Sequence, residues 1–321
     1  MANNSAIPDQ SILFKPVKDM YGSRLALVFG NEFKDGECPF YTAKQCHHCD
    51  IGAGEGTQFS TEMNRERLEF FKQYYADALS SVEHLVLYNS GSTLNKREIS
   101  RKTLSVILDY ASSLQRCKVV SLDSREMYVT EDSLDYLVGH LRKDQQARVI
   151  LGVESQSDEV RIGKLNKRMT KQGIERAFAT VGKYKGKIGL DVNIVFQPPE
   201  LVGEEAIRET VDTVRYSLDL AEKYSVPVDF NYHPFYPTKR SRAMYPNHSR
   251  ADLGDAKRAL IEMKKEIGAR GRKSNIFIGW QDEEHDQEQD VRVTELEREM
   301  KLFERFNATQ DVKILIKEFL T

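Results

Sequence analysis

The chain has 321 residues with 47 Lys or Arg and 49 Asp or Glu, which gives a formal net charge of −2. This balance argues against a protein built around a broad phosphate-binding surface. No apolar run approaches the roughly 18 residues that cross a bilayer, and the first ten residues have no signal-peptide core. Four cysteines are too few for a disulfide scaffold. We therefore expect a cytoplasmic protein that is not attached to a membrane.

Short apolar runs alternate with helix-forming stretches along most of the chain. Strands are predicted at residues 25–29, 84–88, 118–122, 147–155, 190–196 and 227–235. Helices are predicted between them, at 62–80, 96–114, 131–142, 171–184 and 203–224. Because the strands are continuous apolar runs, we expect helices to cover the sheet and right-handed crossovers to join parallel strands.

This alternation predicts an α/β fold with a partial (β/α)6 TIM-like barrel of parallel strands over residues 21–240. Polar turns follow strand after strand, and in such barrels the chemistry collects at the loops after the strands. Residues 1–20 are predicted to be a flexible lead-in. Residues 241–321 are more charged, with helices near 251–268 and 290–306, and are predicted to pack on the barrel as an α/β cap.

Three of the four cysteines lie in one loop after the first predicted strand, in the pattern Cys38-x7-Cys46-x2-Cys49. Three thiolates from one loop can hold three irons of a 4Fe–4S cluster and leave the fourth iron open. Cys117 lies just before the third predicted strand, and buried cysteine is common. We expect Cys117 to be a core residue.

Two other interpretations of the cysteine loop stay open at this point. His47 or His48 could complete a zinc site with three cysteines, but structural zinc sites usually pair two ligand couples, and the second couple is missing. Cys46 and Cys49 could form a redox dithiol, but that motif usually precedes a helix, and Gly52 and Gly54 follow instead.

A strand, a three-cysteine loop and repeated β/α units together resemble the radical S-adenosylmethionine (SAM) enzymes. The resemblance runs from about residue 25 to 236 and includes NSGS (89–92), SLDSRE (121–126), GVES (152–155), LNKRMT (165–170) and FQPPEL (196–201). The commonest loop in that superfamily is C-x3-C-x2-C, and the first gap here is wider. The wider gap is similar to the branch of the Elongator catalytic-subunit-like proteins and the radical SAM subunit of archaeosine synthase.

The resemblance implies two cofactors and a set of residues that hold them. Cys38, Cys46 and Cys49 would ligate a 4Fe–4S cluster, and SAM would chelate its open iron. Residues at the strand ends would contact SAM, namely His48, Asn89, Ser90, Gly91, Ser92, Asp123, Glu154, Lys167 and Asn193. Lys167 would pair with the SAM carboxylate, unless it is a solvated charge in a basic run. Asp123 and Glu154 have an alternative role, because acidic residues after strands often cap the next helix.

The resemblance also implies the reaction. Reductive cleavage of SAM would give a 5′-deoxyadenosyl radical that abstracts hydrogen from the substrate, with electrons from an external donor of the flavodoxin or ferredoxin type. We expect a small, anionic or nucleotide-like substrate in a biosynthetic pathway. Candidate substrate residues are Arg125, Glu126, Gln197, Tyr232, His233, Tyr236, Lys239 and Arg240.

Three alternatives to this function remain. The first is a tRNA-modifying radical SAM lyase that acts with a partner, since the slightly negative charge argues against unaided nucleic-acid binding. The others belong to different classes, a zinc-binding adaptor and a thiol redox protein.

Overall fold

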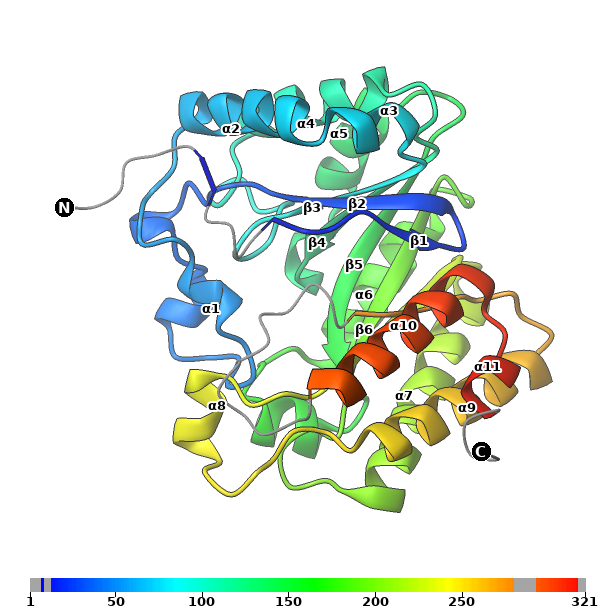
Figure 1. Cartoon of the computed structure of the whole chain (residues 1–321). Helices are drawn as coiled ribbons and strands as arrows, with labels where there is room; N and C mark the ends of the chain where they lie inside the picture. The colour runs from blue at the N-terminus through cyan, green and yellow to red at the C-terminus, as the bar shows by residue number, and fades with distance from the viewer. Residues whose placement is uncertain (1–6, 9–12, 280–292, 317–321) are drawn as a thin grey trace.

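The strands of the protein form one sheet. The structure is a computed structural model that describes residues 7–8, 13–279 and 293–316. Its eight strands follow one another in sequence order across the sheet, which curls into an incomplete barrel (Figure 1). They are β1 (Val17–Asp19), β2 (Gly22–Val28), β3 (His84–Tyr88), β4 (Val119–Ser124), β5 (Gln146–Glu154), β6 (Ile188–Phe196), β7 (Val228–Pro234) and β8 (Ile276–Ile278). β1 is antiparallel to β2, and all later neighbours are parallel.

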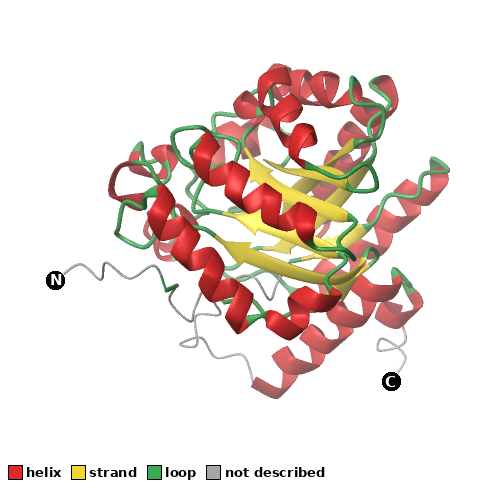
Figure 2. Ribbon diagram, turned by 90° about the horizontal axis from the view of Figure 1, so that it is seen from above, coloured by secondary structure: helices red, strands yellow, loops and turns green. Residues whose placement is uncertain are grey.

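Helices surround the strands, as the view from above shows (Figure 2). They are α1 (Pro39–Thr42), α2 (Thr61–Tyr74), α3 (Ala76–Ser81), α4 (Arg101–Ser113), α5 (Glu131–His140), α6 (Lys171–Gly182), α7 (Gly203–Lys223), α8 (Lys239–Met244), α9 (Leu253–Ala269), α10 (Val293–Thr309) and α11 (Lys313–Ile316). Several begin at a hydroxyl side chain that accepts a hydrogen bond from the first turn, as Ser60 does for α2 and Ser100 for α4. No described helix is both long and apolar enough to cross a membrane.

The predicted fold class is confirmed, because the six predicted strands correspond to β2 to β7 and helices connect them. Two strands were missed, and both are only three residues long, too short for a hydrophobic period to be recognised. β1 lies within the predicted lead-in, and β8 extends the sheet beyond β7. Of the lead-in, residues 1–6 and 9–12 lie outside the described residues, as do residues 290–292 of the last predicted helix.

The main hydrophobic core lies between the outer face of the sheet and the helices. Alternate residues of β2 and β3, such as Leu25 and Leu85, belong to this core. Their neighbours Ala26 and Val86 form a separate small cluster with Ile150, since successive strand residues point to opposite faces. Cys117 is fully buried in the main core, which confirms its predicted place.

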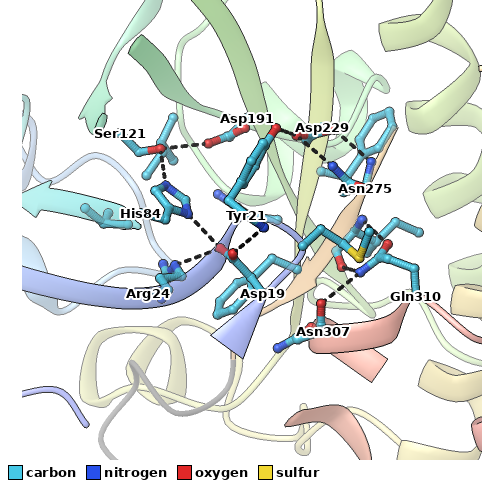
Figure 3. A pocket seen from close by; sticks show the side chains of 17 residues that line it. Asp19, Tyr21, Arg24, His84, Ser121, Asp191, Asp229, Asn275, Asn307 and Gln310 are labelled. Atoms are coloured by element: carbon cyan, nitrogen blue, oxygen red, sulfur yellow. Dashed lines mark hydrogen bonds and ion pairs between the residues drawn. The ribbon is translucent and has the colours of Figure 1, made fainter. Parts of the chain in front are cut away.

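A network of charged side chains fills the barrel where the parallel strands begin, which is the end opposite the cysteine loop (Figure 3). Its centre is Arg148 of β5, whose guanidinium contacts both Asp191 and Asp229. His84 is 2.6 Å from Asp19, and Tyr21 donates to Asp229. Because these charges are paired with one another, the network stabilises the barrel and is a poor candidate for catalysis.

Candidate cofactor site at the carboxyl ends of the strands

The cysteine loop follows β2 and is held by backbone hydrogen bonds from the LNKRMT segment. Cys46 donates its N–H to the Asn166 carbonyl at 3.2 Å, and His47 donates to the Leu165 carbonyl at 2.9 Å. Cys46 has a φ of +54°, a left-handed conformation that the surrounding bonds stabilise. The motif after β5, which the sequence suggested only as a cofactor contact, therefore also fixes the shape of the loop.

The small-residue turn after β3 packs closely against Cys38. A Cβ atom at Gly91 would lie 3.3 Å from the Cys38 Cβ and 1.6 Å from a carboxylate oxygen of Glu98. Only glycine permits this approach. The geometry agrees with the requirement for small residues in this turn.

Glu98 organises the same turn and was missed by the sequence analysis. Its buried carboxylate accepts hydrogen bonds from the Ser92 N–H at 3.0 Å and from the side chains of Asn31 and Asn95 at 3.1 and 2.7 Å. Burial raises the pKa of Glu98. No sequence motif marks this residue, because it lies in an irregular segment six positions beyond Ser92.

Glu154 and Lys167 form a buried ion pair at the carboxyl end of β5, and His48 of the cysteine loop lies beside it. Lys167 donates to the Glu154 carboxylate, and the His48 Nε2 atom lies 3.8 Å from it. Burial by itself would raise the pKa of Glu154, but Lys167 and His48 bring that pKa well below its ordinary value. Burial lowers the pKa of His48. Gly152 leaves room for Lys167, since a Cβ there would lie 2.4 Å from the ammonium nitrogen.

The alternative roles of these charged residues are not found in the structure. Thr130 caps α5 and Thr170 caps α6, so neither Asp123 nor Glu154 caps the helix that follows it. Asp123 accepts a hydrogen bond from the Thr93 hydroxyl instead, and burial raises the pKa of Asp123 to about 8. Lys167 is buried and paired, so it is not a solvated charge.

Buried atoms without a hydrogen-bond partner near the cysteine loop include His48 Nδ1 and Asn89 Nδ2. Arg125 Nε and Glu126 Oε2 also have no hydrogen-bond partner, but they form an ion pair with each other at 3.7 Å. An unpaired buried polar group costs about 1–3 kcal/mol. Such atoms at the edge of the cysteine loop fit a site that takes a polar ligand.

The thiols distinguish among the three interpretations of the loop. Burial raises the pKa of Cys49 to about 11 and that of Cys38 to about 12. A redox dithiol works through a lowered thiol pKa, whereas burial raises the pKa of Cys49. Within the described part of the chain, no three His, Cys, Asp or Glu side chains are grouped to hold one metal ion. A 4Fe–4S cluster needs no such grouping, because each cysteine ligates a different iron atom, and the donor set therefore fits a cluster.

Arg125 and Arg240 are among the residues predicted to bind substrate. In the structure both contact the cysteine loop. Arg125 lies beneath the loop with its Nη1 atom 3.5 Å from the Cys46 sulfur. Arg240 of α8 donates to the carbonyls of Tyr41 and Gln45 at 3.0 and 2.9 Å. Figure 1 places α1 and α8 close together at one side of the barrel. These contacts make both arginines part of the framework around the cysteines.

Two other substrate candidates point toward α9, and the geometry argues against their predicted role. The Tyr232 hydroxyl donates to the Ala256 carbonyl at 3.0 Å, because Tyr232 is on the outer face of β7. Gln197 accepts from the Asp252 N–H at 3.0 Å, at the start of the same helix. Both side chains are buried against the helix, so they are structural residues.

The remaining predicted residues lie at or near the carboxyl ends of β6 and β7. Asn193 accepts a hydrogen bond from Asn231 at 3.0 Å inside the barrel. His233 Nδ1 is 3.1 Å from the Gly279 carbonyl, and Tyr236 is half-buried. Lys239 is exposed on the first turn of α8.

Comparisons with known proteins test the resemblance that the three-cysteine loop suggests. Over 204 residues it is 24% identical to archaeosine synthase subunit beta of Methanosarcina acetivorans, covering 62% of this chain and 55% of that protein. This match confirms the resemblance to the archaeosine synthase branch that the motifs predicted. Over 134 residues the chain is 27% identical to an uncharacterized protein of Methanocaldococcus jannaschii, covering 42% of this chain and 36% of that protein.

The chain spans about a third to about half of the length of these curated relatives. No family model matches it. Among solved structures, coproporphyrinogen III oxidase of Escherichia coli, a radical SAM enzyme, has a TM-score of 0.47 and 11% identity over 82% of this chain and 55% of that one. The radical SAM methyltransferase TsrM of Kitasatospora setae, solved with cobalamin and a 4Fe–4S cluster, has a TM-score of 0.41 and 16% identity over 68% and 36%.

Proposed function

We propose that the chain is a cytoplasmic radical SAM enzyme that holds a 4Fe–4S cluster on Cys38, Cys46 and Cys49. When bound, the cluster would pass one electron to the SAM sulfonium, giving methionine and a 5′-deoxyadenosyl radical that takes a hydrogen atom from the substrate. The observation that carries this proposal is the cysteine loop at the carboxyl end of β2, fixed by backbone bonds to residues 165 and 166 and packed on Gly91. An external one-electron donor of the flavodoxin or ferredoxin type would supply the electron.

The charged group of Glu154 and Lys167 is suited to the methionyl part of SAM, which carries one ammonium and one carboxylate. Lys167 would pair with the carboxylate, and Glu154 would accept from an ammonium or hydroxyl group. In the ligand-free chain the two side chains satisfy each other. Either charge buried without a partner would be strongly destabilising, so the pair keeps both charges satisfied when SAM is not bound.

We propose a small, anionic or nucleotide-like substrate. The net charge of −2 favours such a substrate over unaided binding to RNA. A second candidate is supported by the match to archaeosine synthase subunit beta. In that case the chain would modify a tRNA nucleoside together with a partner that presents the RNA.

Anaerobic reconstitution with iron and sulfide tests the function. We expect a brown protein with about four irons per chain that releases 5′-deoxyadenosine from SAM once dithionite is added. Iron, sulfide and 5′-deoxyadenosine are measured on the same sample. Stoichiometric zinc with no SAM cleavage would instead support the adaptor, and disulfide reductase activity that survives loss of Cys38 would support the redox protein.

The variant Lys167→Ala is expected to weaken SAM binding while the iron content stays at the wild-type level. A hydrogen bond to a charged group contributes about 1.5–3 kcal/mol, which corresponds to a loss of affinity of roughly 10- to 100-fold. Equilibrium dialysis with SAM gives the dissociation constant. The neighbouring Arg168 is exposed, so Arg168→Ala should bind SAM normally. Equal affinities for the two variants would remove Lys167 from the SAM site.

A further inference from the structure

The buried side chain of Arg125 contacts the sulfur of one of the three loop cysteines. Its side chain is only 10% exposed, and Nη1 lies 3.5 Å from the Cys46 sulfur. A donor–acceptor distance of this size is within the range of hydrogen bonds to sulfur, whose atomic radius is larger than that of oxygen. A buried guanidinium thus stands next to one of the three proposed cluster ligands.

The position of the guanidinium is fixed from several sides. It lies over the Phe40 ring, with Cζ 3.8 Å from the ring centre, and Nη2 donates to the Lys167 carbonyl. The backbone N–H of Arg125 donates to the Ser92 hydroxyl at 3.2 Å. These contacts come from the cysteine loop, from the segment after β5 and from the turn after β3, so the guanidinium has little freedom to turn toward a substrate.

We propose that Arg125 is a positioning residue that donates a hydrogen bond to the Cys46 sulfur and raises the reduction potential of the cluster. This inference rests on the proposed function, since it requires a cluster on the three cysteines. It replaces the substrate role that the sequence suggested for Arg125.

The electrostatic reason is the charge that the cluster gains on reduction. One electron adds one negative charge to the cluster and its thiolates, and a nearby cation stabilises that state more than the oxidised one. Hydrogen bonds to sulfur and burial are two of the factors that set the potential of an iron–sulfur cluster. Glu126 opposes this effect, because its carboxylate lies 3.7 Å from Arg125 Nε.

The test is a redox titration of reconstituted protein followed by electron paramagnetic resonance of the reduced cluster. At one applied potential, Arg125→Gln is expected to lower the ratio of reduced to oxidised cluster about tenfold, which is about 59 mV for a one-electron couple. Arg125→Lys keeps the positive charge, so its ratio of reduced to oxidised cluster should be close to that of the wild-type protein. Arg208→Gln removes an exposed arginine from α7 and should leave the ratio unchanged.

A second variant acts in the opposite direction and covers the case in which Arg125→Gln loses iron. Glu126→Gln removes the opposing carboxylate and should raise the ratio of reduced to oxidised cluster. An unchanged potential in Arg125→Gln with full iron content would overturn the inference, as would an unchanged potential in Glu126→Gln. If the wild-type chain itself assembles no cluster, the proposed function fails, and iron analysis distinguishes that result.

Discussion

Cys46→Ser is expected to lose most of its iron and to release no 5′-deoxyadenosine from SAM above background. Two thiolates remain in this variant, and the serine hydroxyl does not ionise readily, so a second iron, besides the open one, would lack a protein ligand. Iron per chain after anaerobic reconstitution and 5′-deoxyadenosine by mass spectrometry measure the two effects. Cys38→Ser and Cys49→Ser should behave in the same way.

Cys117→Ser is the matched control, because it makes the same change at the one cysteine outside the loop. The Cys117 thiol is fully buried and donates to the Val119 carbonyl at 3.3 Å. A hydroxyl can keep this hydrogen bond, so we expect a loss of stability of about 1–3 kcal/mol with iron content and SAM cleavage retained. Equal loss of iron in Cys46→Ser and Cys117→Ser would contradict the assignment of the cluster ligands.

The sequence was sufficient to predict the six central strands and the position of the cysteine loop. β3 is a short, almost wholly apolar run between polar segments, and this pattern can be recognised without tertiary information. The order of the motifs placed Gly91, Glu154 and Lys167 at the same end of the barrel, since the carboxyl ends of parallel strands meet there. The structure agrees on this placement.

What the sequence did not predict depends on the direction of individual side chains. Tyr232 and His233 are neighbours on β7, and adjacent strand residues point to opposite faces, so the two could not both line the interior. This rule was available from the sequence and would have removed Tyr232. Arg125 is a different case, because its contact with Cys46 depends on how two separate loops pack. Glu98 contacts Ser92 within one irregular segment whose shape no sequence pattern indicates.

The variant Asp191→Ala is expected to lower the free energy of unfolding by about 3–5 kcal/mol, because it leaves a buried guanidinium with half of its counter-charge. Arg148 is 4% exposed and is paired with Asp191 and Asp229. Asp191 also accepts from the Ser121 hydroxyl at 3.2 Å. Urea denaturation followed by circular dichroism gives the free energy, and an unchanged slope would show that the variant unfolds from the same native state.

Asp212→Ala removes the same side chain from an exposed pair on α7, in which Asp212 is 2.9 Å from Arg215. Solvent screens this pair, so the expected loss is below about 1 kcal/mol. Similar losses of unfolding free energy for Asp191→Ala and Asp212→Ala would mean that solvent also screens the ion pairs of Arg148 at the base of the barrel, where the parallel strands begin. The base lies at the opposite end of the strands from the cysteines, so folded Asp191→Ala should still bind SAM with wild-type affinity. Loss of SAM affinity in the folded variant would show instead that the charge network and the cofactor site are energetically coupled through the barrel.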